Sequence, residues 1–166
     1  MTMELFLFRH AEAEPRSGET PDERRSLTAK GRERFVRGAQ GLERLEIQLD
    51  RIYHSPWLRS IESAELLSLL LDGETVVTPL LAQPPSRELL DLLEGECVAV
   101  VGHEPWLSDL LGWLVFGVRM IESDGKSQSL DFGKGGLAWV GGKPEPGAMS
   151  LRAFLPPRAL RRLART

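Results

Sequence analysis

The chain has very little cysteine, since Cys97 is the single thiol in 166 residues. One cysteine cannot form a disulfide within the chain, and it cannot build the thiolate clusters that hold structural zinc. Basic charge is not in excess either, because 21 lysines and arginines are outweighed by 24 aspartates and glutamates. Sequence-independent binding of nucleic acid depends on neutralising many phosphates. The net charge of -3 therefore argues against a nucleic-acid partner.

Long hydrophobic runs are also absent. The apolar stretch from Met1 to Phe8 is too short for a signal peptide and runs directly into Arg9. The stretch from Leu107 to Val118 contains two glycines and is shorter than the roughly 20 residues that span a bilayer. We therefore expect no membrane partner and a location in the cytoplasm.

Length and composition are those of one folded domain. Hydrophobic residues make up 42% of the chain and charged residues 27%, as in ordinary globular proteins. A chain of 166 residues suffices for one sizeable core and is short for two. We expect a single domain over residues 1–166. The sequence leaves the oligomeric state open, and a monomer is compatible with it.

Short apolar runs alternate with helical patterns along most of the chain. Strands are predicted over residues 5–8, 51–54, 75–78 and 97–101, and helices over residues 28–45, 55–71, 86–93 and 105–116. Such alternation is typical of a three-layer α/β/α sandwich with a mostly parallel central sheet. Residues 127–140 and 149–154 are predicted to form later, antiparallel strands. Residues 158–165 are predicted as a short basic helix whose charged face is solvated, over Leu160 and Leu163.

Several of these helices begin with recognisable signals. Thr28 can cap the first helix. Ser55 and Pro56 suggest that the serine oxygen caps the second helix and that proline is its first residue, with a phosphate contact by Ser55 as the alternative. Pro105 marks a further helix start in the same way. The N–H groups at the starts marked by Pro56 and Pro105 would favour a bound anion.

Ionisable residues follow three of the predicted strands. Arg9 and His10 come directly after the first strand, and His103 follows the strand over residues 97–101. Arg59 lies on the helix after the second strand. In open α/β sheets, ligands bind beyond the carboxyl ends of the strands, so these four side chains are expected around one point.

Each of these residues alone has a plainer interpretation. Arg59 could pair with Glu62, three residues further along the same helix. A single histidine is more often structural than catalytic, and this is how we interpret His54. It is the joint placement of the four side chains that indicates a site.

Three segments resemble the signature motifs of a known family. They are Leu7-Phe8-Arg9-His10-Ala11-Glu12, Ser55-Pro56-Trp57-Leu58-Arg59-Ser60-Ile61-Glu62-Ser63-Ala64-Glu65 and Val101-Gly102-His103-Glu104-Pro105. In this order and at this spacing they resemble the histidine phosphatase superfamily, which includes the cofactor-dependent phosphoglycerate mutases. The short length, the segment Leu27-Thr28-Ala29-Lys30-Gly31 and the Gly-His-Glu-Pro motif are most similar to the SixA-type phosphohistidine phosphatases. The resemblance implies a phosphoglycerate mutase-like fold with an open site, suited to a phosphate displayed on another protein.

The resemblance also implies a mechanism. His10 would attack phosphorus and form a phosphohistidine intermediate, which water then hydrolyses. For this His10 must be neutral, with its other ring N–H held by a backbone carbonyl. Arg9 and Arg59 would bind the phosphoryl oxygens, and a protonated His103 would add a further donor. Neither a metal nor a cofactor is implied.

The general acid is less well defined. Residues 80–85, where mutase-like members place a carboxylate, contain none. Glu104 resembles by position the acid of the superfamily's acid phosphatase branch, but a structural charge at the start of the next helix is an equal alternative. An imidazole, with a pKa of about 6.5, leaves more readily than an alkoxide. The sequence therefore favours phosphohistidine in a signalling protein as the substrate.

Two other functions stay open. The first is a phosphatase of small metabolite phosphate esters on the same fold. The second is a phosphate-binding module without catalysis, which the presence of all four core side chains disfavours. A mutase is less favoured because it needs a more closed site.

Overall fold

The computed structural model describes residues 2–121 and 130–165 and contains a six-stranded mixed sheet. The strands are β1 (Met3–Arg9), β2 (Leu49–His54), β3 (Leu71–Val77), β4 (Cys97–Gly102), β5 (Leu137–Gly142) and β6 (Met149–Leu155). Their order across the sheet is β3-β2-β4-β1-β5-β6. Strands β1 to β4 run parallel to one another, whereas β5 runs antiparallel to β1 and β6 runs antiparallel to β5. Both the mostly parallel sheet and the antiparallel final strands are confirmed.

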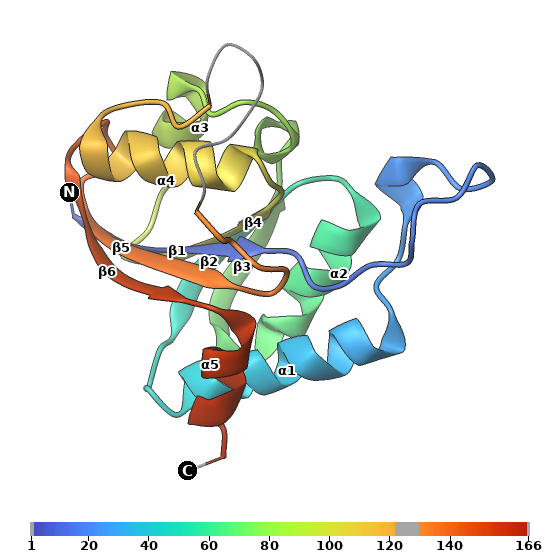
Figure 1. Ribbon diagram of the computed structural model, residues 1–166. Helices are drawn as coiled ribbons and strands as arrows, with labels where there is room; N and C mark the ends of the chain where they lie inside the picture. The colour runs from blue at the N-terminus through green and yellow to red at the C-terminus, as the bar shows by residue number, and fades with distance from the viewer. Residues whose placement is uncertain (1, 122–129, 166) are drawn as a thin grey trace.

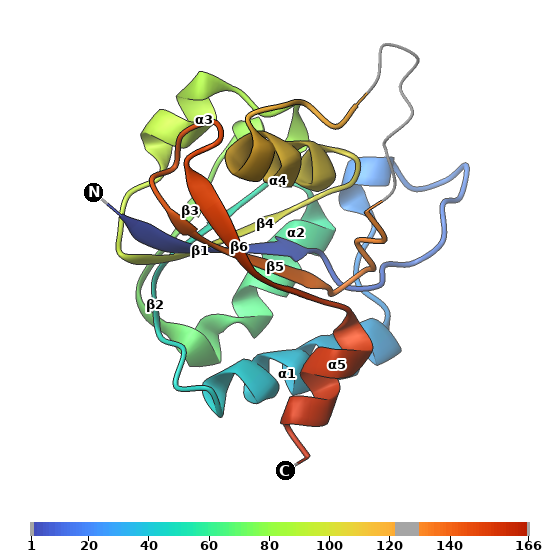
Figure 2. The same cartoon turned by 60° about the vertical axis from the view of Figure 1, so that its left-hand side comes forward.

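Helices cover both faces of the sheet, which makes the three layers predicted from the sequence (Figures 1 and 2). They are α1 (Ala29–Glu43), α2 (Leu58–Leu66), α3 (Arg87–Leu92), α4 (Trp106–Phe116) and α5 (Pro157–Leu163). Helices α3 and α4 lie on one face, and α1, α2 and α5 lie on the other. None of the helices in the described part of the chain is long and apolar enough to cross a membrane.

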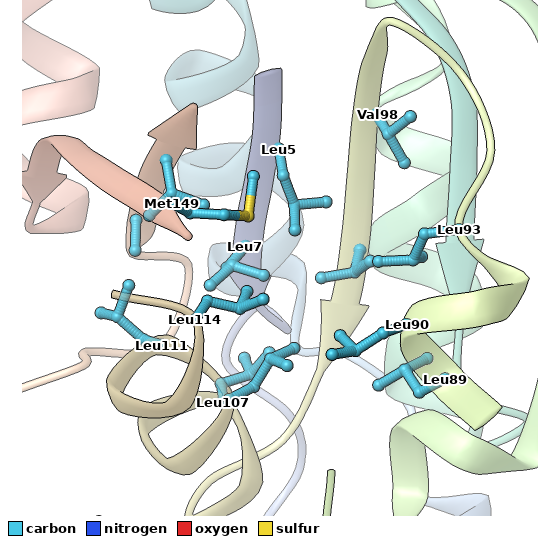
Figure 3. Close-up of a cluster of buried hydrophobic side chains, with 14 of the residues drawn as sticks. Leu5, Leu7, Leu89, Leu90, Leu93, Val98, Leu107, Leu111, Leu114 and Met149 are labelled. Carbon is cyan, nitrogen blue, oxygen red and sulfur yellow. The ribbon is translucent and has the colours of Figure 1, made fainter. Parts of the chain in front are cut away.

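The central strand β1 divides the hydrophobic core into two clusters. Leu5 and Leu7 point to the side of α3 and α4, and Phe6 and Phe8 point to the opposite side. Figure 3 shows Leu5 and Leu7 facing Leu114 and its neighbours on α4. Successive side chains of a strand point to opposite faces, so a continuous apolar run fits a strand that is buried on both sides. This burial fixes β1 and, with it, the position of the residues that follow it.

One of the three predicted helix starts is confirmed, and the other two helices begin later than predicted. Thr28 caps α1, because its Oγ1 accepts a hydrogen bond from the backbone N–H of Gly31 at 2.9 Å. Helix α2, in contrast, begins at Leu58 rather than at Pro56, and no side chain caps it. Pro105 precedes α4 as its N-cap residue and is not its first helical residue.

Several element boundaries also differ from the prediction. Helix α2 ends at Leu66, and the chain then passes through a short 3-10 turn, η2 (Ser68–Leu70), into β3. Strand β3 therefore starts earlier than residue 75, in a stretch whose side chains are mostly exposed. Such an edge strand lacks the apolar alternation on which the prediction depended. The predicted strand over residues 127–140 begins at Leu137 where it is described, and residues 127–129 lie outside the described part.

Candidate active site

Parallel pairing brings the ends of β1, β2 and β4 to one edge of the sheet. Arg9 lies opposite Gly102, and the ladder continues with a hydrogen bond of 3.2 Å from the backbone N–H of His10 to the carbonyl oxygen of Gly102. The backbone N–H of Ser55 donates in the same way to the carbonyl oxygen of Val101, also at 3.2 Å. The residues that leave these three strands therefore start from fixed, neighbouring positions.

His10 is buried and has one defined tautomer. Its Nδ1 lies 2.7 Å from the carbonyl oxygen of Ala11, which can only accept, so Nδ1 carries the proton. Its Nε2 accepts a hydrogen bond of 3.2 Å from Nε of Arg59, which can only donate. Burial lowers the pKa of His10 to about 3, and this effect outweighs the hydrogen bond to the Ala11 carbonyl, which raises the pKa. The neighbouring His103 and Arg59 lower it further. His10 is thus neutral near pH 7, with the lone pair on Nε2.

Arg59 is held by the loop that follows β1. Its Nη1 donates to the backbone carbonyl oxygen of Asp22 at 2.6 Å, and its Nη2 lies 3.2 Å from the Asp22 carboxylate. The guanidinium carbon also lies 4.5 Å from the centre of the Trp57 ring, a cation–π contact. Burial lowers the pKa of Arg59, and Asp22 opposes this effect. The alternative pairing with Glu62 is wrong, because Glu62 instead accepts from the backbone N–H of Leu27 and pairs with Arg32.

In the Arg9 side chain, Nη1 donates a hydrogen bond to the protein, whereas Nε has no partner among the described residues. Its Nη1 donates to the carbonyl oxygen of Phe132 at 2.7 Å, which fixes the direction of the side chain. Its Nε is buried and has no hydrogen-bond partner among the described residues. A buried charged donor without a partner is costly, so this position favours an anionic ligand.

His103 faces His10 and is oriented by two serine hydroxyls. The two imidazole rings are 5.1 Å apart between their centres. Nε2 of His103 lies 2.6 Å from Oγ of Ser55 and 3.2 Å from Oγ of Ser60. Because Oγ of Ser55 also accepts from the backbone N–H of Trp57 at 3.3 Å, its own hydrogen is free for Nε2. When the Ser55 hydroxyl donates to Nε2, the proton of neutral His103 lies on Nδ1.

The proton on Nδ1 of His103 has no protein acceptor. Nδ1 is buried and, like Nε of Arg9, is without a partner among the described residues. Burial lowers the pKa of His103 to about 3, and the nearby guanidinium of Arg59 lowers it further. His103 is therefore neutral in this state, and its role as a protonated donor to a bound phosphoryl group stays a prediction.

These side chains line a cleft of about 570 Å³ at the carboxyl edge of the sheet. Its walls carry five cationic side chains, Arg9, Arg16, Arg25, Arg59 and Lys134, and three acidic ones, Glu12, Asp22 and Glu104. This excess of positive charge suits an anionic ligand. A larger cavity of about 910 Å³ at the opposite edge, lined by Asp50, Arg51 and Glu94 among others, contains none of these groups. Among the described residues, no three histidine, cysteine, aspartate or glutamate side chains are grouped as metal ligands.

Sequence reasoning missed part of this cleft. Residues 10–25 read as an acidic surface loop, yet Asp22 and Arg25 from this loop line the cleft. Nε of Arg25 donates to the Asp22 carboxylate at 2.7 Å, and the Arg25 side chain is only 12% exposed. No local sequence pattern predicts that Asp22 and Arg25 reach the cleft, because their position depends on how the loop folds back over α2.

Comparison with known proteins supports this reading of the cleft. The family model of the histidine phosphatase superfamily (branch 1) matches residues 5–84, which include His10 and Arg59. An uncharacterised protein of Picosynechococcus sp. (strain ATCC 27264 / PCC 7002 / PR-6) is 32% identical over 123 residues, which cover 69% of this chain and 74% of that protein. The chain belongs to the histidine phosphatase superfamily.

Solved structures show that the fold of this superfamily extends over nearly the whole chain. The protein histidine phosphatase SixA in complex with tungstate has a TM-score of 0.74 at 22% identity, covering 95% of this chain and 99% of that chain. The putative phosphohistidine phosphatase SixA from Agrobacterium tumefaciens has a TM-score of 0.72 at 21% identity, covering 93% and 97%. Phosphoserine phosphatase from Entamoeba histolytica has a TM-score of 0.66 at 17% identity, covering 95% and 99%. The fold is thus that of the phosphoglycerate mutase-like proteins.

Membership of the histidine phosphatase superfamily supports a phosphatase activity and a phosphorylated substrate. Glu104 lines the cleft and also lies directly before the N-cap residue of α4. Its carboxylate accepts from the backbone N–H of Ser108 at 3.0 Å and from Oγ of Ser108 at 2.6 Å. Burial raises the pKa of Glu104, and Ser108 and Arg9 oppose the rise. Its role as a general acid stays a prediction.

Proposed function

We propose that this protein removes phosphate from phosphohistidine on another protein, through a covalent phosphohistidine formed on His10. The observation that carries the proposal is the neutral His10, whose Nε2 lone pair lies among Arg59, Arg9 and His103. Nucleophilic catalysis needs this lone pair, and phosphoryl transfer needs donors arranged around the phosphoryl oxygens.

The first chemical step would transfer the phosphoryl group to the enzyme. Nε2 of His10 attacks phosphorus, an N–P bond forms to His10, and the N–P bond to the substrate imidazole breaks. The other ring nitrogen of the substrate histidine carries a proton taken from solvent beforehand, so the departing nitrogen keeps the electron pair of the broken bond and the group leaves as neutral histidine. Nε of Arg9 and Nδ1 of His103, the two buried donors without a partner in the described part, would bind the phosphoryl oxygens. Arg59 would turn its Nε from His10 to the incoming phosphate.

The second step would release phosphate. A water molecule attacks the phosphorus of phospho-His10, an O–P bond forms, and the N–P bond breaks. The electron pair returns to Nε2 of His10, and the proton of the water leaves with phosphate or through the solvent. The proton stays on Nδ1 of His10 throughout, donated to the carbonyl oxygen of Ala11, so the free enzyme is restored with its starting tautomer.

The substrate assignment depends on the leaving group. At the edge of the cleft formed by η3 (Pro79–Ala82), the lining residue is Ala82 rather than a carboxylate. Glu104, the remaining candidate acid, is engaged by Ser108. An imidazole leaves with much less proton assistance than an alkoxide does. A cleft whose candidate general acid is already engaged therefore fits a phosphohistidine substrate. Solved structures with the same fold include a protein histidine phosphatase SixA and a putative phosphohistidine phosphatase SixA.

A second candidate is a phosphatase of small phosphate esters. It is favoured by Glu104, whose raised pKa and position at the cleft suit a proton donor. Phosphoserine phosphatase from Entamoeba histolytica shows that the same fold serves a small ester.

The first candidate, a phosphohistidine phosphatase acting on a signalling protein, agrees with the cytoplasmic location predicted from the sequence.

The test combines phosphoenzyme trapping with substrate comparison. Wild type, His10→Ala and His54→Asn would receive a protein phosphorylated on histidine, phosphoserine and sugar phosphates. His54→Asn is the matched control, because asparagine can still donate to the carbonyl oxygen of Ser55 as Nδ1 of His54 does at 2.8 Å. We expect an acid-labile label on wild type and His54→Asn, none on His10→Ala, and fastest turnover of phosphohistidine. Undiminished turnover by folded His10→Ala would overturn the mechanism, and faster turnover of the esters would favour the second candidate.

A further inference from the structure

Helices α1 and α5 pack unusually closely, although they come from opposite ends of the chain (Figures 1 and 2). Leu160 of α5 is 1% exposed and lies against α1. A Cβ atom added at Gly41 would lie 2.3 Å from the backbone oxygen of Leu160, so only glycine allows this approach. The tail helix is therefore a fixed part of the surface, and its arginines have defined neighbours on α1.

A small cavity of about 210 Å³ lies between α1, α5 and the segment that precedes β5. Four of its lining residues are cationic, and we call them the α1–α5 basic surface: Arg34, Lys134, Arg158 and Arg161. Of the described residues that line it, Glu12 is the one acidic side chain. Glu12 and Lys134 also line the catalytic cleft, and Ala11, which follows His10, lines the cavity. The basic surface is thus continuous with the cleft.

The charges on this surface are poorly compensated. Arg34 lies 3.7 Å from the Glu12 carboxylate, which is a loose ion pair. Within the described ranges, Lys134, Arg158 and Arg161 have no carboxylate within salt-bridge distance. The pKa of Arg161 is lowered, chiefly by burial and to a smaller extent by Arg34 and other neighbouring arginines. Like charges held together in this way repel one another, and an anionic partner would relieve the repulsion.

We propose that the α1–α5 basic surface docks an acidic segment of the phosphorylated protein whose phosphohistidine enters the His10 cleft. This inference rests on the proposed function and adds the chemistry of the partner to it. A protein partner can occupy both the surface and the cleft at once, because the two share lining residues. A chain with a net charge of -3 and one small basic patch lacks the extended basic track that nucleic acid requires.

The decisive variant is the charge reversal R158E/R161E, which leaves every residue that lines the catalytic cleft in place. We expect kcat/KM on a histidine-phosphorylated protein with acidic residues beside its histidine to fall by about tenfold at low salt, mainly through association. The loss should shrink at high ionic strength, where such charges are screened. Turnover of p-nitrophenyl phosphate should stay within about twofold.

Lys143→Glu is the control for a charge reversal elsewhere, because it reverses one charge in the exposed turn after β5, at the opposite edge of the sheet. It should leave both activities near wild type. Replacing the partner's acidic residues by lysine should restore part of the activity of R158E/R161E, which would identify the contact as direct.

Each further outcome has one meaning. If wild type fails to turn over any protein phosphohistidine, the proposed function fails, whatever the variants do. If wild type succeeds and R158E/R161E equals it at low salt, the docking surface is overturned. An equal loss on p-nitrophenyl phosphate also overturns it, because the variant would then disturb the cleft. Loss of binding to phosphatidylserine vesicles or single-stranded DNA, with unchanged kcat/KM on the protein, would assign the surface to those ligands instead.

Discussion

Oγ of Ser55 lies 2.6 Å from Nε2 of His103, although the two residues are 48 positions apart in the chain. Locally, Ser55 resembles a helix cap, and this was its expected role. The hydroxyl instead contacts the imidazole of His103, which we propose to be catalytic, and its oxygen still accepts from the backbone N–H of Trp57. Ser55 is therefore a positioning residue that acts through His103.

Loss of this hydroxyl should slow the chemical step. We expect Ser55→Ala to reduce kcat by about tenfold, because a net hydrogen bond of about 1 kcal/mol or more fixes the Nδ1–H tautomer of His103. KM should change little, since Arg9 and Arg59 still bind the phosphoryl group. Steady-state kinetics on a fixed substrate measure both terms.

Ser60→Ala is the comparison for Ser55→Ala, because its hydroxyl contacts the same nitrogen at the longer distance of 3.2 Å. It should cause a smaller loss in kcat. A rise in KM with unchanged kcat in Ser55→Ala would instead indicate that the hydroxyl binds phosphate directly.

The sequence predicted which proposed catalytic residues meet in the cleft better than it predicted the residues that hold them. Arg9, His10 and His103 lie directly at strand ends, and parallel strands in register bring such positions together. The backbone carbonyl that holds His10 belongs to its own neighbour, Ala11, so it too is a local feature. Asp22 could not be predicted in the same way, because its contact with Arg59 depends on the path of an irregular loop.

Asp22 also limits how strongly the cleft attracts phosphate. Its carboxylate contacts Arg59 and Arg25, so it occupies donors that an incoming anion could use. We expect Asp22→Asn to tighten binding of inorganic phosphate by about threefold to tenfold, because one negative charge beside the cationic groups is removed. Isothermal titration at low salt measures the dissociation constant.

Glu19→Gln is the control for Asp22→Asn, since it removes an exposed charge of the same loop that does not line the cleft. It should leave phosphate affinity nearly unchanged. Weaker phosphate binding by Asp22→Asn would show that the carboxylate chiefly positions Arg59, and the competition described above would then be wrong.

The two buried histidines of the cleft, His10 and His103, should make stability depend on pH. Burial lowers the pKa of both His10 and His103 to about 3, below the value of about 6.5 expected in the unfolded chain. Between these values the unfolded chain binds protons that the folded chain does not, so the free energy of unfolding falls as pH decreases through this window. Each histidine can contribute a slope of at most about 1.4 kcal/mol per pH unit.

Urea denaturation at several pH values in this window measures that slope. The double variant His10→Gln/His103→Gln should show a shallower slope than wild type, because glutamine does not titrate. An unchanged slope would mean that other groups take up the protons on unfolding.

Two glycines of α1 test the packing that holds the basic surface. At Gly41 a new Cβ would meet the backbone oxygen of Leu160 at 2.3 Å, whereas at Gly38 it would lie 3.5 Å from Cβ of Leu160, an ordinary contact. Both positions are helical, so alanine gains about 1 kcal/mol of helix propensity at each. Only at Gly41 is this gain opposed by a clash with backbone, for which overpacking costs about 1–3 kcal/mol. Gly38→Ala should therefore be neutral or stabilising in thermal unfolding, and Gly41→Ala should be destabilising and should increase amide exchange in α5. Equal Tm values for the two variants would show that α5 moves freely on α1, and that its arginines are not held as a fixed surface.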